Sequence, residues 1–293
     1  MLRLTGCCFL LFCNPALSIS AEQKPLPFYS QVQSGVVRLE HYEVIQKEGQ
    51  GEPSRRTVPD GTGFFVHDVQ HCYIVTAGHV ARQDYDLHGA VPLNQTATGK
   101  VEVWDLILPR SHWLFHREKG SATTHPVDVA VMKIAETPGW EKKAFSYCPV
   151  KCREKEYNQL EQHAEPPDEV VIFGFPLDIG LKLKEPRPMG RRGTVALQAN
   201  EEFIIMENKF VERQGYLVEA KMFPGNSGSP VIKMPLLSGK LYLVGLVMGS
   251  NPNLDYAVVE PVSRIQEVLD IAKTSQRMGS WRRREQQALE NHR

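Results

Sequence analysis

The sequence predicts an all-β fold of two successive antiparallel barrels followed by one helix. Short runs of β-branched and aromatic residues recur along the chain, separated by Gly, Pro, Asn and Asp, and this pattern is typical of barrels. Near the end of the chain the apolar period becomes helical. The runs of the first half are Gly63–Val66, Tyr73–Thr76, Val101–Leu108 and Val127–Ile134. Those of the second half are Glu169–Phe173, Gly193–Ala199, Phe203–Met206, Tyr216–Ala220, Ser229–Lys233, Leu241–Met248 and Tyr256–Val259.

The segments between these runs set the expected domain boundaries. We expect a signal peptide at 1–20, a first barrel at 21–140, a charged, proline-containing linker at 141–168, a second barrel at 169–260, a helix at 261–273 and a basic polar tail at 274–293. Three polar stretches rich in Gly or Pro predict surface loops: Gln46–Asp60, Asp84–Gly99 and the mobile loop Asp178–Arg192. The tail carries Arg282, Arg283 and Arg284. We expect it to fray, and contact with an acidic surface is the alternative.

Composition limits the class of protein. The 293 residues include 34 basic and 34 acidic side chains and are 42% apolar, which indicates a soluble globular chain and gives no reason to expect a nucleic-acid partner. The apolar stretch at 4–19 ends in Ser-Ile-Ser-Ala, a pattern typical of a secretory signal. It is too short and too interrupted for a stable membrane span, which needs about twenty apolar residues. We therefore expect a secreted or periplasmic protein, with a lipoprotein anchor at Cys7 as the minority alternative.

Cysteine usage argues against a disulfide framework. Removal of the signal leaves Cys72, Cys148 and Cys152, an odd number. We expect Cys72 to be a buried apolar residue of its strand. Whether Cys148 and Cys152 form a disulfide across a short loop stays open.

The chemistry is expected at the turn Gly-Asn-Ser-Gly-Ser-Pro-Val, residues 225–231. A serine hydroxyl needs a base to become a nucleophile, and acyl transfer needs N–H donors aimed at the developing oxyanion. The flanking glycines allow a tight turn in which the N–H groups of Gly225 and Ser227 face one point beside the hydroxyl. Alone, such a motif is often an ordinary solvated loop.

A base and its orienting carboxylate are found upstream of this serine. His79 follows an apolar run that ends in Thr-Ala-Gly, and Asp128 directly precedes the apolar run Val-Ala-Val. A carboxylate at the head of a buried strand needs a partner, and the Nδ1–H of a histidine is suitable. A histidine base would make activity fall on the acid side of neutrality.

Together the strings Thr-Ala-Gly-His at 76–79, Asp-Val-Ala-Val at 128–131 and the turn at 225–231 resemble the trypsin-like serine peptidases, and most of all the HtrA/Deg and glutamyl endopeptidase branches. The strings at 61–66, 174–176 and 245–249 also resemble that family. The resemblance covers about 31–273. It implies two six-stranded antiparallel barrels of chymotrypsin type with the active site between them, and a C-terminal helix. HtrA/Deg enzymes usually carry a PDZ domain after the protease; this chain shows none, so PDZ-linked peptide sensing is not expected.

The resemblance implies a serine endopeptidase that acts on protein or peptide substrates through an acyl-enzyme, with catalytic residues His79, Asp128 and Ser227, and an oxyanion hole at Gly225 and Ser227. No metal or organic cofactor is implied. Lys221 would lie near the base of the substrate pocket, with Met248 and Gly249 along its wall. The pocket would accept small or medium apolar side chains of the substrate if Lys221 points away from it, and acidic side chains if Lys221 points into it.

Two pairs of histidines, at 67 and 71 and at 112 and 116, have a four-residue offset that on a helix could bind one metal ion. In extended stretches a four-residue offset separates them by about 13 Å, too far for one ion. Two other classes of function stay open: a non-catalytic binding module with this fold, and a serine esterase with the same triad. The sequence makes no prediction about oligomeric state, zymogen processing or natural substrate.

Overall fold

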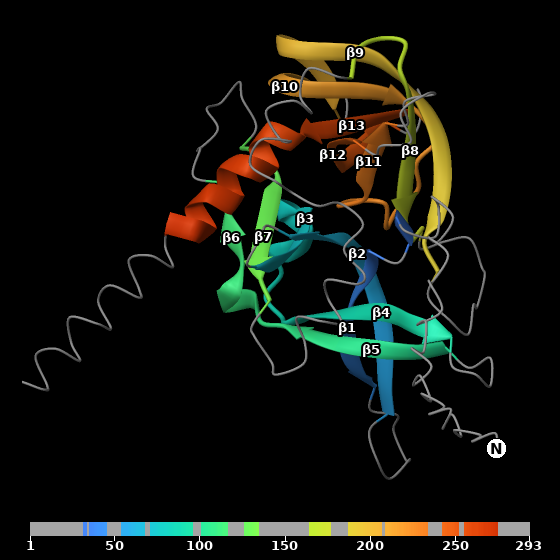
Figure 1. Cartoon of the computed structure of the whole chain (residues 1–293), viewed down its shortest axis with the longest axis vertical. Helices are drawn as coiled ribbons and strands as arrows, with labels where there is room; N and C mark the ends of the chain where they lie inside the picture. Colours follow the sequence, from blue (N-terminus) through green and yellow to red (C-terminus); the bar gives the residue numbers. More distant parts are fainter. Residues whose placement is uncertain are drawn as a thin grey trace, which may run out of the picture.

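The computed structural model describes residues 32–33, 35–45, 54–67, 71–95, 101–116, 126–134, 164–176, 187–206, 209–233, 242–251 and 255–274. The chain is mostly β and has a chymotrypsin-like arrangement of two antiparallel sheets with a helix at 262–274 (Figure 1). The predicted all-β class and the predicted helix are confirmed. The signal at 1–20, Cys148, Cys152, most of the linker and the tail beyond 274 lie outside the described residues.

The first sheet has seven strands in the order β5-β4-β1-β2-β3-β7-β6. Their bounds are β1 Val36–Ile45, β2 Ser54–His67, β3 Cys72–Ala77, β4 Leu87–Gln95, β5 Val101–Leu108, β6 Leu114–Phe115 and β7 Val129–Lys133. For the first half of the chain the sequence predicts a closed six-stranded barrel. The described residues instead form a curled sheet with β5 and β6 at its edges. Strand β6 is only two residues long, which is too short to form an extended ladder with the far edge.

The second sheet is the closed six-stranded barrel that the sequence predicts, in the order β10-β13-β12-β11-β8-β9. Its strands are β8 Glu169–Gly174, β9 Met189–Met206, β10 Lys209–Glu219, β11 Pro230–Lys233, β12 Tyr242–Asn251 and β13 Tyr256–Pro261. The two predicted runs Gly193–Ala199 and Phe203–Met206 belong to the single long strand β9. Closure leaves no free edge among these strands.

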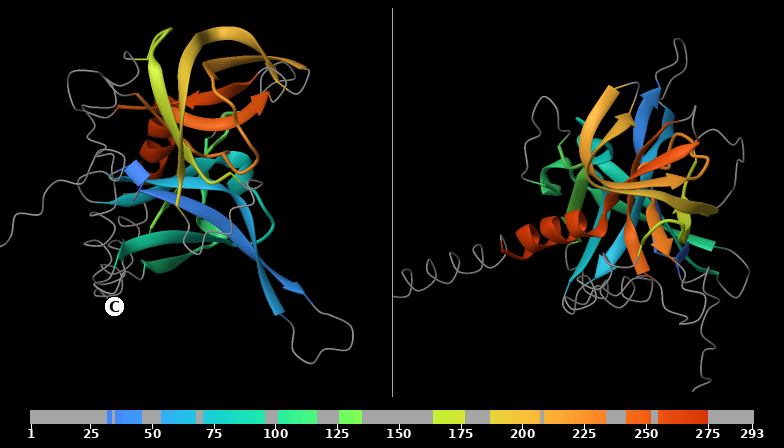
Figure 2. Two further views of the ribbon diagram at one scale, coloured as in Figure 1. Left: turned by 90° about the vertical axis from the view of Figure 1, so that its right-hand side faces the viewer. Right: turned by 90° about the horizontal axis from the view of Figure 1, so that it is seen from above.

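Helical segments flank the strands at several points of the described chain. The four-residue helix α2 (Gly78–Ala81) follows β3, and the 3₁₀ turn η1 (Arg110–His112) follows β5. The C-terminal helix buries Val262, Ile265, Val268, Leu269 and Ala272, as its apolar period predicts. It lies beside β6 and β7 of the first sheet (Figures 1 and 2), and its Glu267 contacts His116. Among the described residues, no helix is long and apolar enough to span a membrane.

One hydrophobic core continues through both sheets and the helix. Phe64 and Tyr73 of the first sheet belong to the same buried cluster as Phe173 and Leu246 of the barrel and Ile265 of the helix. Because apolar burial contributes roughly 25 cal/mol per Å², this shared core fixes how the sheets sit against each other. The seam between them can therefore hold a precise site.

The prediction of three surface loops is wrong for part of each loop, because those parts form strands. Ser54–Asp60 lies in β2, Leu87–Gln95 forms β4, and Met189–Arg192 begins β9. The β1–β2 ladder continues to Ile45↔Ser54, where β1 ends in mostly exposed residues, and Figure 2 shows this hairpin extending beyond the rest of the molecule. Hydrogen bonds between the two backbones stabilise the strands there although the sequence has no apolar run. A polar sequence of this kind predicts a loop.

Candidate active site

His79 is positioned by the end of β3 and the short helix α2. The Gly78 N–H donates to Asp128 O at 2.9 Å, and the His79 N–H donates to Asp128 Oδ1 at 2.8 Å. A side chain at Gly78 would lie 2.8 Å from Asp128 Oδ1, so glycine is needed for this close approach. The His79 side chain is 51% exposed, which leaves the imidazole accessible at the rim.

Asp128 lies opposite His79, one residue before β7. Its Oδ2 accepts a hydrogen bond from His79 Nδ1 at 2.6 Å, and its side chain is only 11% exposed. The Asp128 N–H donates to Glu260 Oε1 at 2.7 Å, and Glu260, on β13, is 1% exposed. Arg82 Nη1 lies 3.8 Å from Asp128 Oδ1. His79 and Arg82 thus hold the carboxylate, and the barrel holds the backbone of Asp128 through Glu260.

Ser227 comes from the other side of the seam, in the turn between β10 and β11. Gly225 and Gly228 have φ of 90° and 84°, a region that favours glycine, so both glycines predicted to shape the turn do so. The turn is tied to the barrel by Gly228 N→Val247 O at 2.7 Å and to the first sheet by Thr62 N→Ser227 O at 2.9 Å.

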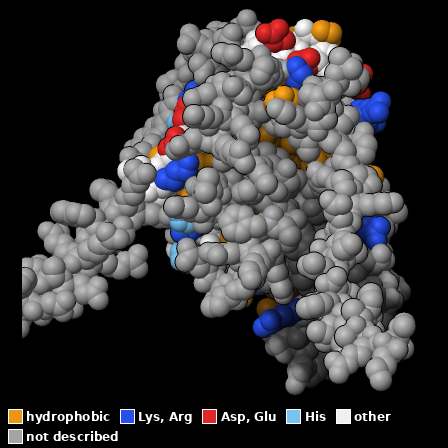
Figure 3. Space-filling model, in the orientation of Figure 1, with side chains coloured by type: hydrophobic (Ala, Val, Ile, Leu, Met, Phe, Trp, Pro, Cys, Tyr) orange, Lys and Arg blue, Asp and Glu red, His pale blue; other side chains and the backbone are white. Residues whose placement is uncertain are grey.

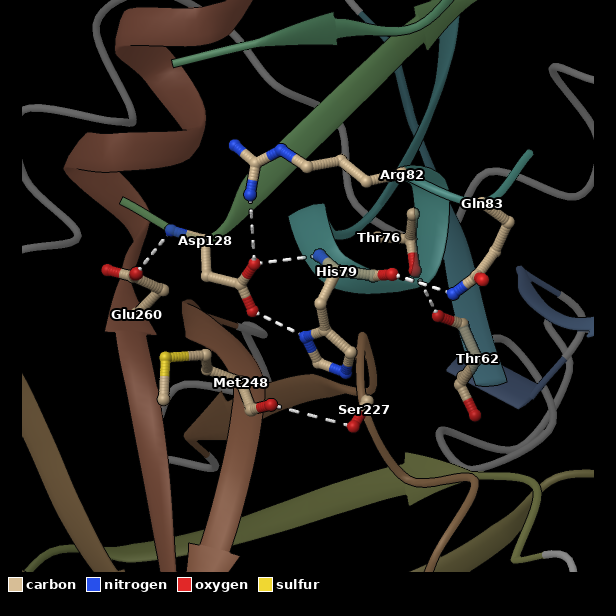
Figure 4. Close-up of polar contacts among 9 residues, drawn as sticks. All are labelled: Thr62, Thr76, His79, Arg82, Gln83, Asp128, Ser227, Met248 and Glu260. Atoms are coloured by element: carbon tan, nitrogen blue, oxygen red, sulfur yellow. Dashed lines mark hydrogen bonds and ion pairs between the residues drawn. The ribbon is translucent and has the colours of Figure 1, made fainter. Parts of the chain in front are cut away.

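The structure brings His79 and Asp128 together but does not join Ser227 to them by a hydrogen bond. Figure 4 shows the imidazole between the Asp128 carboxylate and the Ser227 side chain. The Ser227 hydroxyl donates to Met248 O at 3.5 Å, at the outer limit for a hydrogen bond. Nucleophile–base bonds are often long in the absence of substrate. The convergence of all three residues therefore stays a prediction.

The N–H groups of Gly225 and Ser227 have no acceptor among the described residues, whereas the neighbouring Asn226 N–H donates to Phe223 O at 3.1 Å. Two unused donors in an otherwise bonded turn are what an oxyanion hole requires. Their use as an oxyanion hole stays a prediction.

The family model for the trypsin-like peptidase domain matches residues 61–235. This match covers more than half of the chain and includes His79, Asp128 and Ser227. The chain belongs to the trypsin-like peptidase family. Comparison with curated protein sequences gives no match.

Solved structures similar to this trypsin-like peptidase include the HtrA-type protease AlgW with a decapeptide, with a TM-score of 0.54 and 12% identity over 84% of this chain. The chain spans 66% of the length of that protein. The active form of the Rv3671c protease from M. tuberculosis has a TM-score of 0.46 at 17% identity, over 83% of each chain. A serine endoprotease from Yersinia pestis has a TM-score of 0.44 at 16% identity, over 85% of this chain and 67% of that one. At such identities, the likeness to AlgW concerns the fold.

The residues predicted to form the substrate pocket of this peptidase lie near the Ser227 turn. Lys221 is exposed, Gly249 is half-buried and Met248 is 6% exposed. Next to them, Arg191 Nη1 donates to Lys221 O at 3.2 Å, and the guanidinium carbon lies 4.3 Å from the Phe223 ring centroid. Burial lowers the pKa of Arg191 below its usual range. The pocket role of Lys221, Met248 and Gly249 stays a prediction.

Sequence reasoning missed three residues of the peptidase site. Glu260 had no local signal, because it lies in an apolar strand 132 residues from Asp128. Arg82, over the ring of Phe115 at 4.8 Å, lies one helical turn after His79, a spacing that indicates proximity. Thr62 lies between two glycines, a pattern that indicates close backbone approach.

In the view of Figure 3, the described residues that reach the surface include both basic and acidic side chains. Within the described ranges, no group of three or more His, Cys, Asp or Glu side chains is arranged to hold a metal ion. Cys72, expected to be a buried apolar residue, is a free cysteine and is 5% exposed.

Proposed function

We propose that this chain is a serine endopeptidase that cleaves peptide bonds through an acyl-enzyme, with Ser227 as nucleophile, His79 as base and Asp128 as its orienting carboxylate. The bond from His79 Nδ1 to Asp128 Oδ2 at 2.6 Å is the main support. A histidine that donates from Nδ1 presents Nε2 as a proton acceptor, and in Figure 4 the ring lies next to Ser227.

In the first half of the proposed reaction, the Ser227 oxygen attacks the carbonyl carbon of the scissile bond while its proton passes to His79 Nε2. The hydroxyl first exchanges its weak bond to Met248 O for one to His79 by rotation of the serine side chain. When the tetrahedral intermediate collapses, the C–N bond breaks and the amine takes the proton from His79.

In the second half, a water molecule gives its proton to His79 and attacks the acyl carbon. The ester bond to Ser227 then breaks, and the proton returns to the serine oxygen. In both halves the free N–H groups of Gly225 and Ser227 would hold the oxyanion, and Asp128 would stabilise the imidazolium.

The test is labelling by a fluorophosphonate together with hydrolysis of casein. Ser227→Ala should abolish both while leaving the fold intact. Ser229→Ala is the matched control: this serine lies in the same turn, is 0% exposed, and its Oγ has no hydrogen-bond partner within the described part of the chain, so the variant should keep both activities. Labelling that survives Ser227→Ala would refute the assignment. Hydrolysis of an acetate ester without casein cleavage would point to an esterase, and no labelling of the wild type to a non-catalytic module.

The proposed substrate pocket consists of Lys221, Met248 and Gly249. Cleavage of a peptide library by wild type and by Lys221→Met decides between the two preferences: loss of acidic P1 residues in the variant would place the lysine in the pocket, and an unchanged profile would exclude it.

We also propose export from the cytoplasm, supported by the signal-like sequence at 1–20. N-terminal sequencing of the mature protein should begin near Ala21; a mature protein that still begins at Met1 would contradict this.

A further inference from the structure

Thr62 lies at the seam between the two sheets, directly behind the Ser227 turn. It belongs to β2 of the first sheet and is 0% exposed. Figure 4 shows it beside Thr76, whose hydroxyl donates to Thr62 O at 2.7 Å. That bond keeps the Thr62 backbone aligned with β3. The residue is therefore a fixed point of the first sheet that faces the barrel.

Two polar atoms of Thr62 reach across the seam to the turn. Its N–H donates to Ser227 O at 2.9 Å, and its Oγ1 donates to Gly225 O at 2.8 Å. The same Oγ1 accepts the N–H of Phe175, just after β8, at 3.0 Å. One buried side chain thus satisfies partners from two parts of the barrel.

These bonds fall on the two residues that carry the proposed oxyanion donors. Thr62 holds each of them by its carbonyl, while their N–H groups have no acceptor among the described residues. Gly225 has a φ of 90°, and a glycine can rotate to many other conformations at little cost. The Thr62 hydroxyl removes that freedom by anchoring the Gly225 carbonyl.

The fit around Thr62 leaves little room for an alternative. A Cβ on Gly228 would lie 2.0 Å from Thr62 O, and one on Gly174 would lie 3.2 Å from Thr62 Oγ1. On the other side, a Cβ on Gly61 would lie 3.1 Å from Ser227 O. Gly228 and Gly174 therefore bring the backbone into contact with this threonine, and Gly61 allows the close approach of Ser227, so small displacements of the Thr62 hydroxyl are transmitted to the turn.

We propose that Thr62 is a positioning residue: its hydroxyl, through the Gly225 carbonyl, holds the Gly225 and Ser227 N–H groups in the orientation that receives the oxyanion. This inference rests on the proposed function of the site. It makes the first sheet a contributor to oxyanion stabilisation as well as the source of the base.

The experiment compares Thr62→Val, which keeps the shape and loses the hydroxyl, with Thr62→Ser, which keeps the hydroxyl. Ser229→Ala is the control, because it removes another buried hydroxyl of the same turn, at a residue that is also 0% exposed, without removing a hydrogen bond to Thr62 or Gly225. Rates on a peptide ester are expressed per folded molecule, as judged by urea unfolding.

Thr62→Val should lower kcat about tenfold to a hundredfold with little change in KM, because misplaced donors act on the transition state. Thr62→Ser should restore most of kcat, and Ser229→Ala should keep most of kcat. If Thr62→Val retains kcat within about twofold, or if Ser229→Ala loses as much kcat as Thr62→Val, the positioning role is overturned, whereas the proposed peptidase activity is not affected by that result.

A crystal structure of Thr62→Val decides the question independently of turnover. The proposal is supported if the Gly225 carbonyl and the Gly225 and Ser227 N–H groups point in other directions than in the wild type. It is overturned if their orientation is unchanged. If the wild type shows no Ser227-dependent turnover, the proposed function fails, and this structural comparison still tests the role of Thr62.

Discussion

Gly228→Ala should disrupt the Ser227 turn more severely than any other single methyl group added there. Gly228 has a φ of 84°, where a residue other than glycine costs about 1–3 kcal/mol. The added Cβ would lie 2.0 Å from Thr62 O, 2.4 Å from Thr76 Oγ1 and 3.1 Å from Ala77 N. Two of these are backbone atoms of the first sheet, so the strain cannot be relieved by a side-chain rotation.

Overpacking of this kind costs about 1–3 kcal/mol, which brings the expected loss in the free energy of unfolding to about 2–6 kcal/mol. Domains of this class are stable by about 5–15 kcal/mol. The melting temperature should therefore fall by about 4–24 °C, at about 2–4 °C per kcal/mol. Turnover should fall as well, because the clash separates Ser227 from the first sheet.

The assay is unfolding in urea, monitored by tryptophan fluorescence, and casein hydrolysis is measured in parallel. Gly89→Ala serves as the control: its Cβ would meet side-chain atoms, Val37 Cγ1 at 3.0 Å and Leu106 Cβ at 3.5 Å, and Gly89 lies in the extended strand β4. The control should stay within about 1 kcal/mol of the wild type. A Gly228→Ala protein as stable and as active as Gly89→Ala would refute the reasoning.

Two further predictions concern buried or partly buried polar groups. Glu260→Leu leaves the buried Asp128 N–H without its acceptor and should lower the free energy of unfolding by about 1–3 kcal/mol. Glu260→Gln keeps an acceptor oxygen and should lose less stability. A Leu variant that is as stable as the wild type in urea would contradict this. Burial, and next the hydrogen bond to Asp60 at 2.6 Å, raise the pKa of Tyr85 above its usual 10. The unfolded chain therefore releases this proton first, so the stability contributed by Tyr85 is present below pH 10 and is lost as pH rises above it, toward the raised pKa. Urea unfolding between about pH 8 and pH 11, the range around an ordinary tyrosine pKa, should show a shallower decline for Tyr85→Phe, and equal slopes would exclude the effect.

The buried strands were predictable because burial on both faces leaves an apolar run in the sequence. Strand β3 is buried along its whole length, and the run Tyr73–Thr76 falls inside it. The far end of the β1–β2 hairpin is different, because its residues are mostly exposed and only backbone pairing holds it. No period in the sequence marks such a strand.

The candidate site divides in the same way. His79 and Asp128 were predictable as partners because each lies at the end of an apolar run and each needs the other chemically. The hydrogen bonds that hold the site residues from behind were not predictable. Glu260 bonds to Asp128, 132 positions away, and Thr62 bonds to Gly225, 163 positions away. Single-sequence patterns report neighbours within a turn or a strand and contain no information about such pairs.

Because Glu260 lies on β13, the last of the described strands to leave the ribosome supplies the acceptor for the Asp128 N–H. The same strand pairs with β10 and β12, so the barrel cannot close without it. A nascent chain that has released only its first sheet thus contains His79 and Asp128 but neither the serine turn nor this support. Because such pairing joins residues far apart along the chain, it forms slowly, and the support for Asp128 is completed only after the strands of the barrel have been made.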